Sequence, residues 1–177
     1  MPNEWNLRYD QWVIGDGEPH RRVGETFDWF VVEFFNDEEL QVLGDQSKSA
    51  IAMPDFQYRV VAELVYLSEK ACVLDFGLRA VGPSSNLISG CRQGDLVSGE
   101  IGIGIPLCTE VIPENLLRTL RYRWRVNRIS ADVTPYVPSS NNSRLFVRDS
   151  SRIEYRKINS TESFRANSYI LHCSEVK

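Results

Sequence analysis

The sequence predicts an all-β, or mainly β, protein that forms an antiparallel β-barrel or sandwich with one or two short helices. Three observations support this fold class. Apolar residues recur with a period of two, β-branched and aromatic residues fill these alternating runs, and clusters of Gly, Pro, Ser and Asn separate them. The chain has 177 residues, of which 42% are hydrophobic, so it is long enough to bury a sizeable core.

The first half of the sequence contains one expected central strand and one expected hairpin. Residues 26–35 are apolar on both faces, which predicts a strand in the middle of a sheet. Residues 57–67 and 71–80 are two apolar runs joined by a short polar turn at 68–70, and this pattern predicts a β-hairpin. Gly77 lies inside the second run and predicts a bulge or a bend there.

Two short segments carry helix signals. Asn36 and Asp37 precede a periodic apolar run that ends at Gly44, which predicts one short capped helix. Pro113 and Glu114 open a second segment with residues suited to the first turn of a helix. Clusters of turn-forming residues predict loops at 45–49, 82–85 and 138–143.

The second half is richer in expected strands. Residues 95–105 alternate, with one face formed by Val97, Gly99, Ile101, Ile103 and Ile105. Gly102 and Gly104 lie on the other face, where small residues let a barrel strand coil sharply or let another backbone approach. A long strand is expected at 119–133, and shorter strands are expected at 144–148, 152–158 and 168–174.

The domain organisation has two interpretations. The chain length suits either a single domain over residues 1–177 or two tandem small barrels of the OB or SH3 type, at residues 1–90 and 91–177. The second interpretation rests on a faint repeat, because residues 23–27 and 94–97 both place a glycine-containing turn before a long strand.

Composition and cysteine spacing predict a soluble, cytoplasmic protein. No run of about 18 apolar residues is present, so no transmembrane helix is expected. The first five residues have neither the basic nor the apolar region of a secretory signal. No cysteine pair has CxxC spacing, so free thiols are expected, three or four of them on buried strands: Cys72, Cys91, Cys108 and Cys173.

The N-terminal residues 10–29 carry a combination of tryptophans and turn residues. This segment resembles the opening of an uncharacterised family of small bacterial proteins, which has a D-x-W strand, a turn with G-x-P, then V-G and a strand ending in Trp. The matching residues are Asp10, Trp12, Gly17-Glu18-Pro19, Val23-Gly24 and Trp29. A cysteine pair of the family is replaced here by Gly15-Asp16. The resemblance implies a small β-barrel and no known activity.

Charge is distributed unevenly along the chain, whose net charge is −4. Residues 1–90 carry 15 acidic and 7 basic side chains, whereas residues 91–177 carry 9 acidic and 13 basic ones. Such a split can steer a charged partner, or the two halves can complement each other across the fold. A candidate acidic surface in the first half consists of Asp28, Glu33, Asp37, Glu38 and Glu39.

A candidate basic stripe lies in the second half. Arg121, Arg123 and Arg125 would project from one face of the expected strand about 7 Å apart, a spacing that suits successive phosphates of a nucleic acid. Tyr122 and Trp124 would face the core, although single-strand binders need exposed aromatic rings. The alternative is a face paired with carboxylates of neighbouring strands. The stripe is completed by Arg128, Arg148 and Arg152.

No sequence motif identifies an enzyme. The chain has two histidines, and His172 and Cys173 are adjacent on an expected strand, so they point to opposite faces. A nucleophile elbow, a phosphate loop, a dinucleotide fingerprint and a zinc-protease motif are absent from the sequence. The polar residues between Asp10 and His20 predict an exposed turn rather than a metal site.

These observations predict a non-catalytic binding or interaction protein without metal or cofactor. It would act through a charged barrel surface, with the acidic residues as the contact and a regulatory or inhibitory effect on a basic protein partner. A membrane partner is not expected. The first alternative is an OB-like nucleic-acid-binding protein that uses the Arg-rich strand. The second is an enzyme with a pocket inside the barrel.

Overall fold

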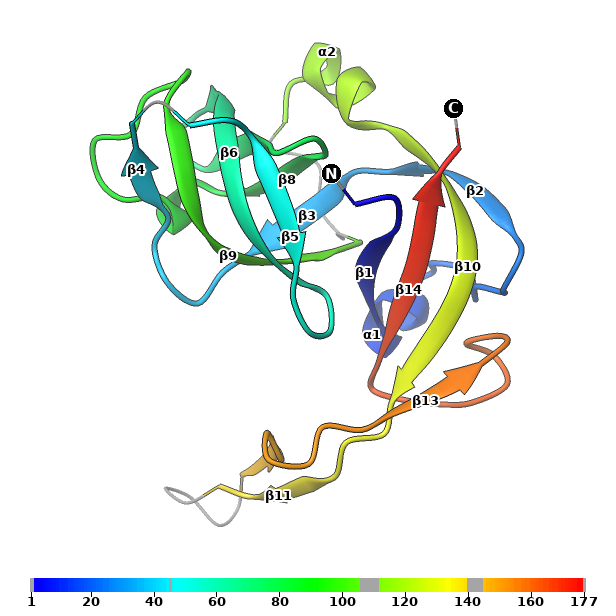
Figure 1. Ribbon diagram of the computed structural model, residues 1–177. Helices are drawn as coiled ribbons and strands as arrows, with labels where there is room; N and C mark the ends of the chain where they lie inside the picture. The colour runs from blue at the N-terminus through cyan, green and yellow to red at the C-terminus, as the bar shows by residue number, and fades with distance from the viewer. Residues whose placement is uncertain (1, 45, 106–111, 140–144, 177) are drawn as a thin grey trace.

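The protein is mostly β-structure and contains a closed five-stranded barrel (Figure 1). The computed structural model describes residues 2–44, 46–105, 112–139 and 145–176. Among the described residues, strands account for 52% and helices for 9%. The predicted mainly-β class, with a barrel and few helices, is therefore confirmed.

The described residues form strands over most of the chain. In chain order these are β1 (Trp5–Asp10), β2 (Thr26–Phe30), β3 (Val32–Phe35), β4 (Gln41–Leu43), β5 (Ser49–Ala52), β6 (Gln57–Leu67), β7 (Ala71–Asp75), β8 (Arg79–Pro83), β9 (Leu96–Gly104), β10 (Tyr122–Asp132), β11 (Tyr136–Pro138), β12 (Phe146–Arg148), β13 (Tyr155–Ile158) and β14 (Ser168–Glu175). The helices are α1 (Gln11–Gly15) and α2 (Glu114–Leu117), with 3-10 turns at Ser84–Asn86 and Arg118–Leu120.

The barrel closes through β9, β3, β8, β7 and β6 in that order, because β6 also pairs with β9. Its neighbouring strands are antiparallel except β3 and β8, which run parallel. The pairing of β6 with β7 shifts register between Leu64 and Tyr66. An irregularity of this kind bends a strand, which helps β6 to reach a partner on each side.

Alternating burial on the long barrel strands explains why they form. On β6 the buried residues are Tyr58, Val60, Ala62 and Leu64, and the residues between them are exposed or half-buried. On β9 the side chains of Val97, Ile101 and Ile103 are buried, and the glycines Gly102 and Gly104 between and after them are buried as well. These inward side chains fill the barrel, because a barrel of this size is packed by its own side chains.

A second sheet packs beside the barrel and shares its hydrophobic core. Its strand order is β13-β10-β14-β1, and β2 pairs with the first part of β10. A single parallel pair, Arg8 with Gly104, joins β1 of this sheet to β9 of the barrel. Trp124 on β10 and Leu171 on β14 belong to the same buried cluster as the barrel residues. The two sheets therefore stabilise each other through one continuous core.

A two-stranded arm projects from the second sheet (Figure 1). We use the term arm for the described residues 136–139 and 145–153, which include β11 and β12 paired antiparallel. At its base, the Nε atom of Arg148 lies 2.8 Å from a carboxylate oxygen of Asp132. The Nη1 atom of Arg148 also lies 3.8 Å from Asp55, in the loop between β5 and β6. These ion pairs connect the arm to the second sheet and to the barrel.

The prediction of a short helix that ends at Gly44 is wrong. Residues 41–43 instead form β4, which pairs with β9. The turn before β4 is held by Asn36, whose Nδ2 atom donates to the backbone oxygens of Glu38 and Asn86. Pairing with a distant strand satisfies the backbone here and overrides the local helix signal. The helix predicted to begin near Pro113 is confirmed as α2.

Two predicted strands are each divided in the structure. Residues 26–35 form β2 and β3, which pair with β10 and with β8 and β9 respectively, so the chain passes from one sheet to the other at Val31. Residues 71–80 contain the turn between β7 and β8, where Gly77 has a φ of 95°. The bend predicted at this glycine is confirmed. The sequence did not predict β1 or α1, and β5 begins within the expected loop at 45–49.

Cysteine positions agree in part with the sequence prediction. Cys72 on β7 and Cys173 on β14 are buried, whereas Cys91 is half-buried in a loop, and all three are free thiols. Cys108 lies outside the described residues. The barrel combines β9 with strands that precede residue 90. The number of domains stays a prediction.

Candidate binding groove

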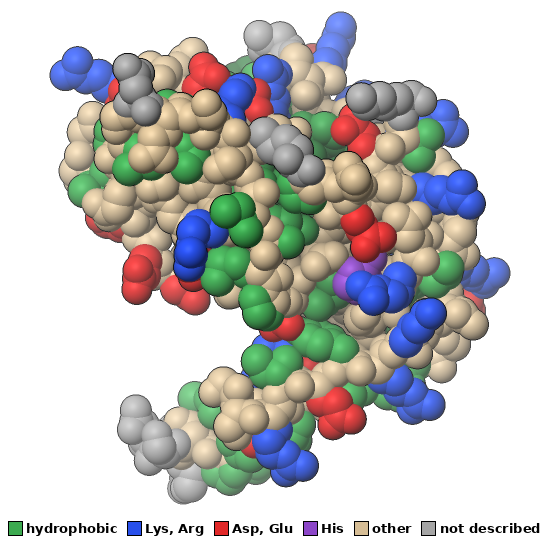
Figure 2. Space-filling model, viewed as in Figure 1, with side chains coloured by type: hydrophobic (Ala, Val, Ile, Leu, Met, Phe, Trp, Pro, Cys, Tyr) green, Lys and Arg blue, Asp and Glu red, His purple; other side chains and the backbone are tan. Residues whose placement is uncertain are grey.

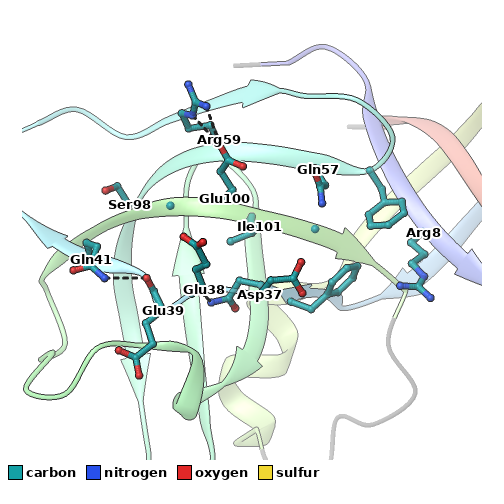
Figure 3. A pocket seen from close by; sticks show the side chains of 15 residues that line it. Arg8, Asp37, Glu38, Glu39, Gln41, Gln57, Arg59, Ser98, Glu100 and Ile101 are labelled. Atoms are coloured by element: carbon teal, nitrogen blue, oxygen red, sulfur yellow. Dashed lines mark hydrogen bonds and ion pairs between the residues drawn. The ribbon is translucent and has the colours of Figure 1, made fainter. Parts of the chain in front are cut away.

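A groove of about 690 Å³ runs along the outside of the barrel beside β9 (Figure 3). Residues after the end of β3 form one wall, the first residues of β6 form the other, and the middle of β9 lies between them. Arg8 from β1 stands at one end, where the second sheet meets the barrel. The groove is therefore built by segments that are far apart in the sequence.

Two glycines on β9 allow neighbouring side chains to pack directly on the backbone. A Cβ atom at Gly99 would lie 2.6 Å from Cδ2 of Leu40, and a Cβ atom at Gly102 would overlap the ring of Phe35. Both distances are shorter than van der Waals contact. The prediction that Gly102 and Gly104 permit a close approach is confirmed. The ring of Phe35 packs on the backbone at Gly102, and the backbone oxygen of Arg8 lies 3.1 Å from the position that a Cβ atom would take at Gly104.

The end of the groove near β1 combines aromatic rings with a guanidinium group. The rings of Phe35 and Phe56 have centroids 5.6 Å apart. The guanidinium of Arg8 lies 5.6 Å from the first centroid and 5.5 Å from the second, within cation–π range of both. Its Nε atom donates to Oδ1 of Asp10 at 2.9 Å. These contacts fix the side chain of Arg8 over an apolar surface.

The remaining length of the groove is rich in carboxylates. Asp37, Glu38 and Glu39 are exposed on the wall that follows β3, and Figure 3 shows them opposite Glu100 and Arg59. Glu100 is paired with Arg59, whose Nη2 atom lies 2.7 Å from Oε1. Within the described part of the chain, no ion pair engages the other three carboxylates. The groove therefore presents uncompensated negative charge beside a partly apolar end.

The structure groups three of the five residues of the predicted acidic surface. Asp37, Glu38 and Glu39 line the groove, but Asp28 lies on β2 in the second sheet, where it pairs with Nε of Arg123 at 3.1 Å. Glu33 lies on β3 and lines a second hollow, which shares Arg8 and Phe35 with the groove. Partial burial raises the pKa of its carboxyl group. The prediction that all five form one contact surface stays untested, and the geometry favours only the groove residues.

The predicted basic stripe is present in part. Arg123, Arg125 and Arg128 are exposed on β10, and a register shift after Val126 keeps Arg128 on their side of the strand. Arg121 is exposed just before β10 begins. The remaining two arginines of the stripe lie in the arm: Arg148 and Arg152.

The aromatic residues beside the stripe are not available for stacking with bases. Trp124 is fully buried, and the hydroxyl of Tyr122 accepts a hydrogen bond from the backbone N–H of Arg79 at 2.7 Å. One of the stripe arginines, Arg123, is already paired with Asp28. The stripe therefore has the exposed charge of a nucleic-acid-binding surface but not its aromatic platform.

A buried histidine, His172, lies on β14, and its neighbouring strands in the second sheet are β10 and β1. Ring atom Nδ1 of His172 is 2.9 Å from Nη2 of Arg128 and 2.7 Å from Oδ1 of Asn6, and Nε2 is 3.0 Å from Oγ of Ser130. Burial lowers its pKa to about 4, and the charge of Arg128 acts in the same direction. The ring is therefore neutral at pH 7. Because its partners come from β1 and β10, no sequence spacing indicated this cluster.

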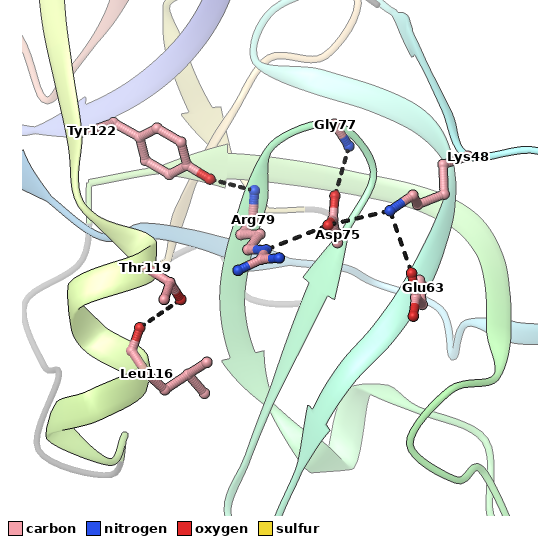
Figure 4. A network of polar contacts seen from close by, with 8 residues as sticks. All are labelled: Lys48, Glu63, Asp75, Gly77, Arg79, Leu116, Thr119 and Tyr122. Atoms are coloured by element: carbon pink, nitrogen blue, oxygen red, sulfur yellow. Dashed lines mark hydrogen bonds and ion pairs between the residues drawn. The ribbon is translucent and has the colours of Figure 1, made fainter. Parts of the chain in front are cut away.

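An ion network joins the barrel strands β6, β7 and β8 to Lys48, which directly precedes β5 (Figure 4). The Nζ atom of Lys48 lies 3.3 Å from Glu63 and 3.3 Å from Asp75, and Arg79 reaches the same oxygen of Asp75 at 3.3 Å. Burial alone would raise the pKa of Asp75, but the Gly77 N–H and Lys48 outweigh it and hold the pKa below its ordinary value. Each of the four side chains has an ionic partner within the network, which indicates a structural role.

Metal and membrane features are not found in the described part of the chain. No group of three or more His, Cys, Asp or Glu side chains there could hold a metal ion. Among the same residues, none of the helices has the length and apolar character needed to cross a bilayer.

Comparison with models of known protein families, with curated proteins and with solved structures yields no match. The structure of the chain is therefore the basis on which its class of protein is described. It is a mainly β protein with a closed five-stranded barrel and a carboxylate-rich groove on the barrel wall.

Proposed function

We propose that this protein is a non-catalytic interaction protein that binds a basic, extended segment of a protein partner in the groove beside β9, and so regulates or inhibits that partner. The observation that carries the proposal is the combination of three uncompensated carboxylates, Asp37, Glu38 and Glu39, with the apolar end formed by Phe35 and Phe56.

A Lys- or Arg-rich segment suits both parts of this groove. The cationic ends are attracted to the carboxylate wall, and negative charge on one surface speeds the encounter with a basic partner. An apolar side chain of such a segment can cover the rings of Phe35 and Phe56, which the guanidinium of Arg8 already contacts. Arg8 limits the register, because a basic side chain placed next to its guanidinium would be repelled. The groove therefore favours a segment with an apolar residue at the Arg8 end.

The first test measures binding of a fluorescein-labelled decapeptide in which Lys alternates with Val, by fluorescence anisotropy. Neutralising the wall with D37N/E38Q/E39Q should weaken binding by about tenfold or more, since three charge contacts of modest strength are lost. The matched control is D16N/E114Q/E154Q, which removes the same charge from exposed positions elsewhere. The control should keep the affinity of the original protein.

Two further results distinguish a specific groove from general charge attraction. A decapeptide that alternates Glu with Val should not bind, and the affinity for the Lys peptide should fall as salt rises. Equal loss of affinity in the groove variant and the matched control would refute a specific site. Co-purification from the source cell should then recover a basic protein with the original chain and not with the groove variant.

Nucleic-acid binding by β10 is a second candidate, supported by the shared exposed face of Arg123, Arg125 and Arg128. It predicts salt-dependent binding to a single-stranded oligonucleotide. R123E/R125E should abolish this binding, whereas D37N/E38Q/E39Q should not reduce it. If oligonucleotide binding is absent at low salt, or unchanged in R123E/R125E, this candidate is excluded.

A further inference from the structure

Exposed apolar side chains are concentrated on the arm, and Figure 2 shows several of them along its length. Six of the ten large hydrophobic residues exposed in the described chain belong to it: Tyr136, Val137, Leu145, Phe146, Val147 and Ile153. Phe146 has 59% of its surface exposed, which is high for an aromatic residue on a strand. A concentration of exposed apolar side chains of this kind is typical of an interaction site.

In the described part of the chain, no backbone hydrogen bond links the outer edges of the arm to another segment. Its ladder has Ser139 N–H donating to Leu145 at 2.7 Å and Asp149 N–H donating to Pro135 at 2.9 Å. Since hydrogen-bonded pairs alternate in an antiparallel ladder, Val137 and Val147 form the bonded pair between these two. The N–H and C=O groups of Phe146 and Arg148 consequently point away from β11, towards the outside of the arm.

The two edges of the arm differ in their ability to accept another strand. On β11 the outward residues are Tyr136 and Pro138, and a proline has no N–H to donate. On β12 both outward residues have complete backbone groups. A two-stranded ribbon is marginally stable by itself, so addition of strands at the β12 edge would stabilise it.

Charge does not oppose the approach of an identical edge. Arg148 is the one charged residue of β12, and its guanidinium is compensated by Asp132 at 2.8 Å and held further by the hydroxyl of Tyr155 at 2.8 Å. Two copies of this strand can therefore meet without placing uncompensated like charges side by side. An edge without a proline, a lysine or an unpaired charge lacks the usual protection against self-pairing.

We propose that the arm is a homodimerisation element, in which β12 pairs antiparallel with β12 of a second copy of this chain. A two-fold axis through Val147 places Phe146 opposite Arg148 of the second copy. In this register the outward groups of both residues form four backbone hydrogen bonds, and the two ribbons become one four-stranded sheet. The contact is self-complementary, as a two-fold interface requires. It is independent of the groove beside β9.

The two-fold register makes a specific prediction, because Val147 of each copy would lie directly across the axis from Val147 of the other. V147K and V147E should each weaken self-association by about tenfold or more, since each places like charges opposite one another. An equimolar mixture of the two variants should restore it, because the heterodimer pairs opposite charges. The side chain is 40% exposed, so both substitutions are compatible with the fold.

Sedimentation velocity over a range of concentrations measures these states. The original chain should show a concentration-dependent monomer–dimer equilibrium, because the contact is smaller than a permanent interface. I51K and I51E at the exposed Ile51 of β5 are the controls, and they should dimerise like the original chain. A chain that stays monomeric at the highest soluble concentration would overturn the proposal. Equally, a V147K–V147E mixture that associates no better than either variant alone would overturn it.

Discussion

The buried histidine of the second sheet should make the stability of the protein depend on pH. His172 is 6% exposed, and burial lowers its pKa from an ordinary value of 6.5 to about 4 in the folded protein. The unfolded chain therefore binds a proton at a higher pH than the folded chain. The contribution to stability is complete above pH 6.5, falls as the pH decreases, and is lost below about pH 4.

The two pKa values give the size of this effect. Between pH 7 and pH 5, the free energy of unfolding should fall by about 2 kcal/mol through this one group. The assay is urea unfolding of the original chain and of H172Q at both pH values. Because glutamine does not titrate here, the variant should lose about 2 kcal/mol less than the original chain over the same interval.

Two control measurements separate the protonation of His172 from unrelated effects of the substitution. H20Q, at the exposed second histidine, should keep the pH dependence of the original chain. The NMR resonances of the His172 ring should not titrate between pH 8 and about pH 5 in the unsubstituted protein. A His172 ring that titrates near pH 6.5, or an H172Q variant with unchanged pH dependence, would show that the site is more solvated than the structure indicates.

Three other substitutions or reagents test the fold. Y58F removes the hydroxyl that accepts the Asn6 N–H at 2.6 Å, and it should lower the free energy of unfolding by about 1–3 kcal/mol, since a polar group loses its partner. G102V would drive the ring of Phe35 from its place on β9 and should cost about 1–3 kcal/mol, measured by the same urea unfolding. A stable G102V protein would show that the ring moves freely. Burial raises the pKa of the Cys173 thiol, so a maleimide should label this residue, as read by mass spectrometry, only after unfolding.

Strand positions were predictable where the sequence alternates over many residues. The strands β6, β9 and β10 are long enough for a period of two to be distinguished from a helical period, and all three lie where the sequence predicts them. The segment that forms β4 is only three residues long, and its neighbours include residues that also start helices. Its conformation depends on pairing with β9, about fifty residues later, which no local pattern reports.

The candidate groove was predictable only in its acidic part. Asp37, Glu38 and Glu39 are adjacent in the sequence, so their proximity in space was certain. Asp28 is close to them in sequence, but the crossing between sheets at Val31 places it on β2 in the second sheet, whereas the groove lies along the barrel. The aromatic end combines residues from β1, β3 and the loop before β6. Contacts between such distant segments are set by strand pairing, which one sequence does not reveal.

The pairing of β1 with β14 has a consequence for how the chain folds during synthesis. Residues 5–10 are hydrogen-bonded to residues 168–173, so the second sheet cannot be completed until nearly all of the described chain has been made. The barrel strands lie within residues 32–104 and can close much earlier. Compact units of a chain tend to fold as they emerge from the ribosome, and long-range strand pairing is slow. We therefore expect the barrel to fold on the ribosome before β14 is available to pair with β1. Exposed apolar residues of β1, such as Leu7, are then the surface that a chaperone would have to protect.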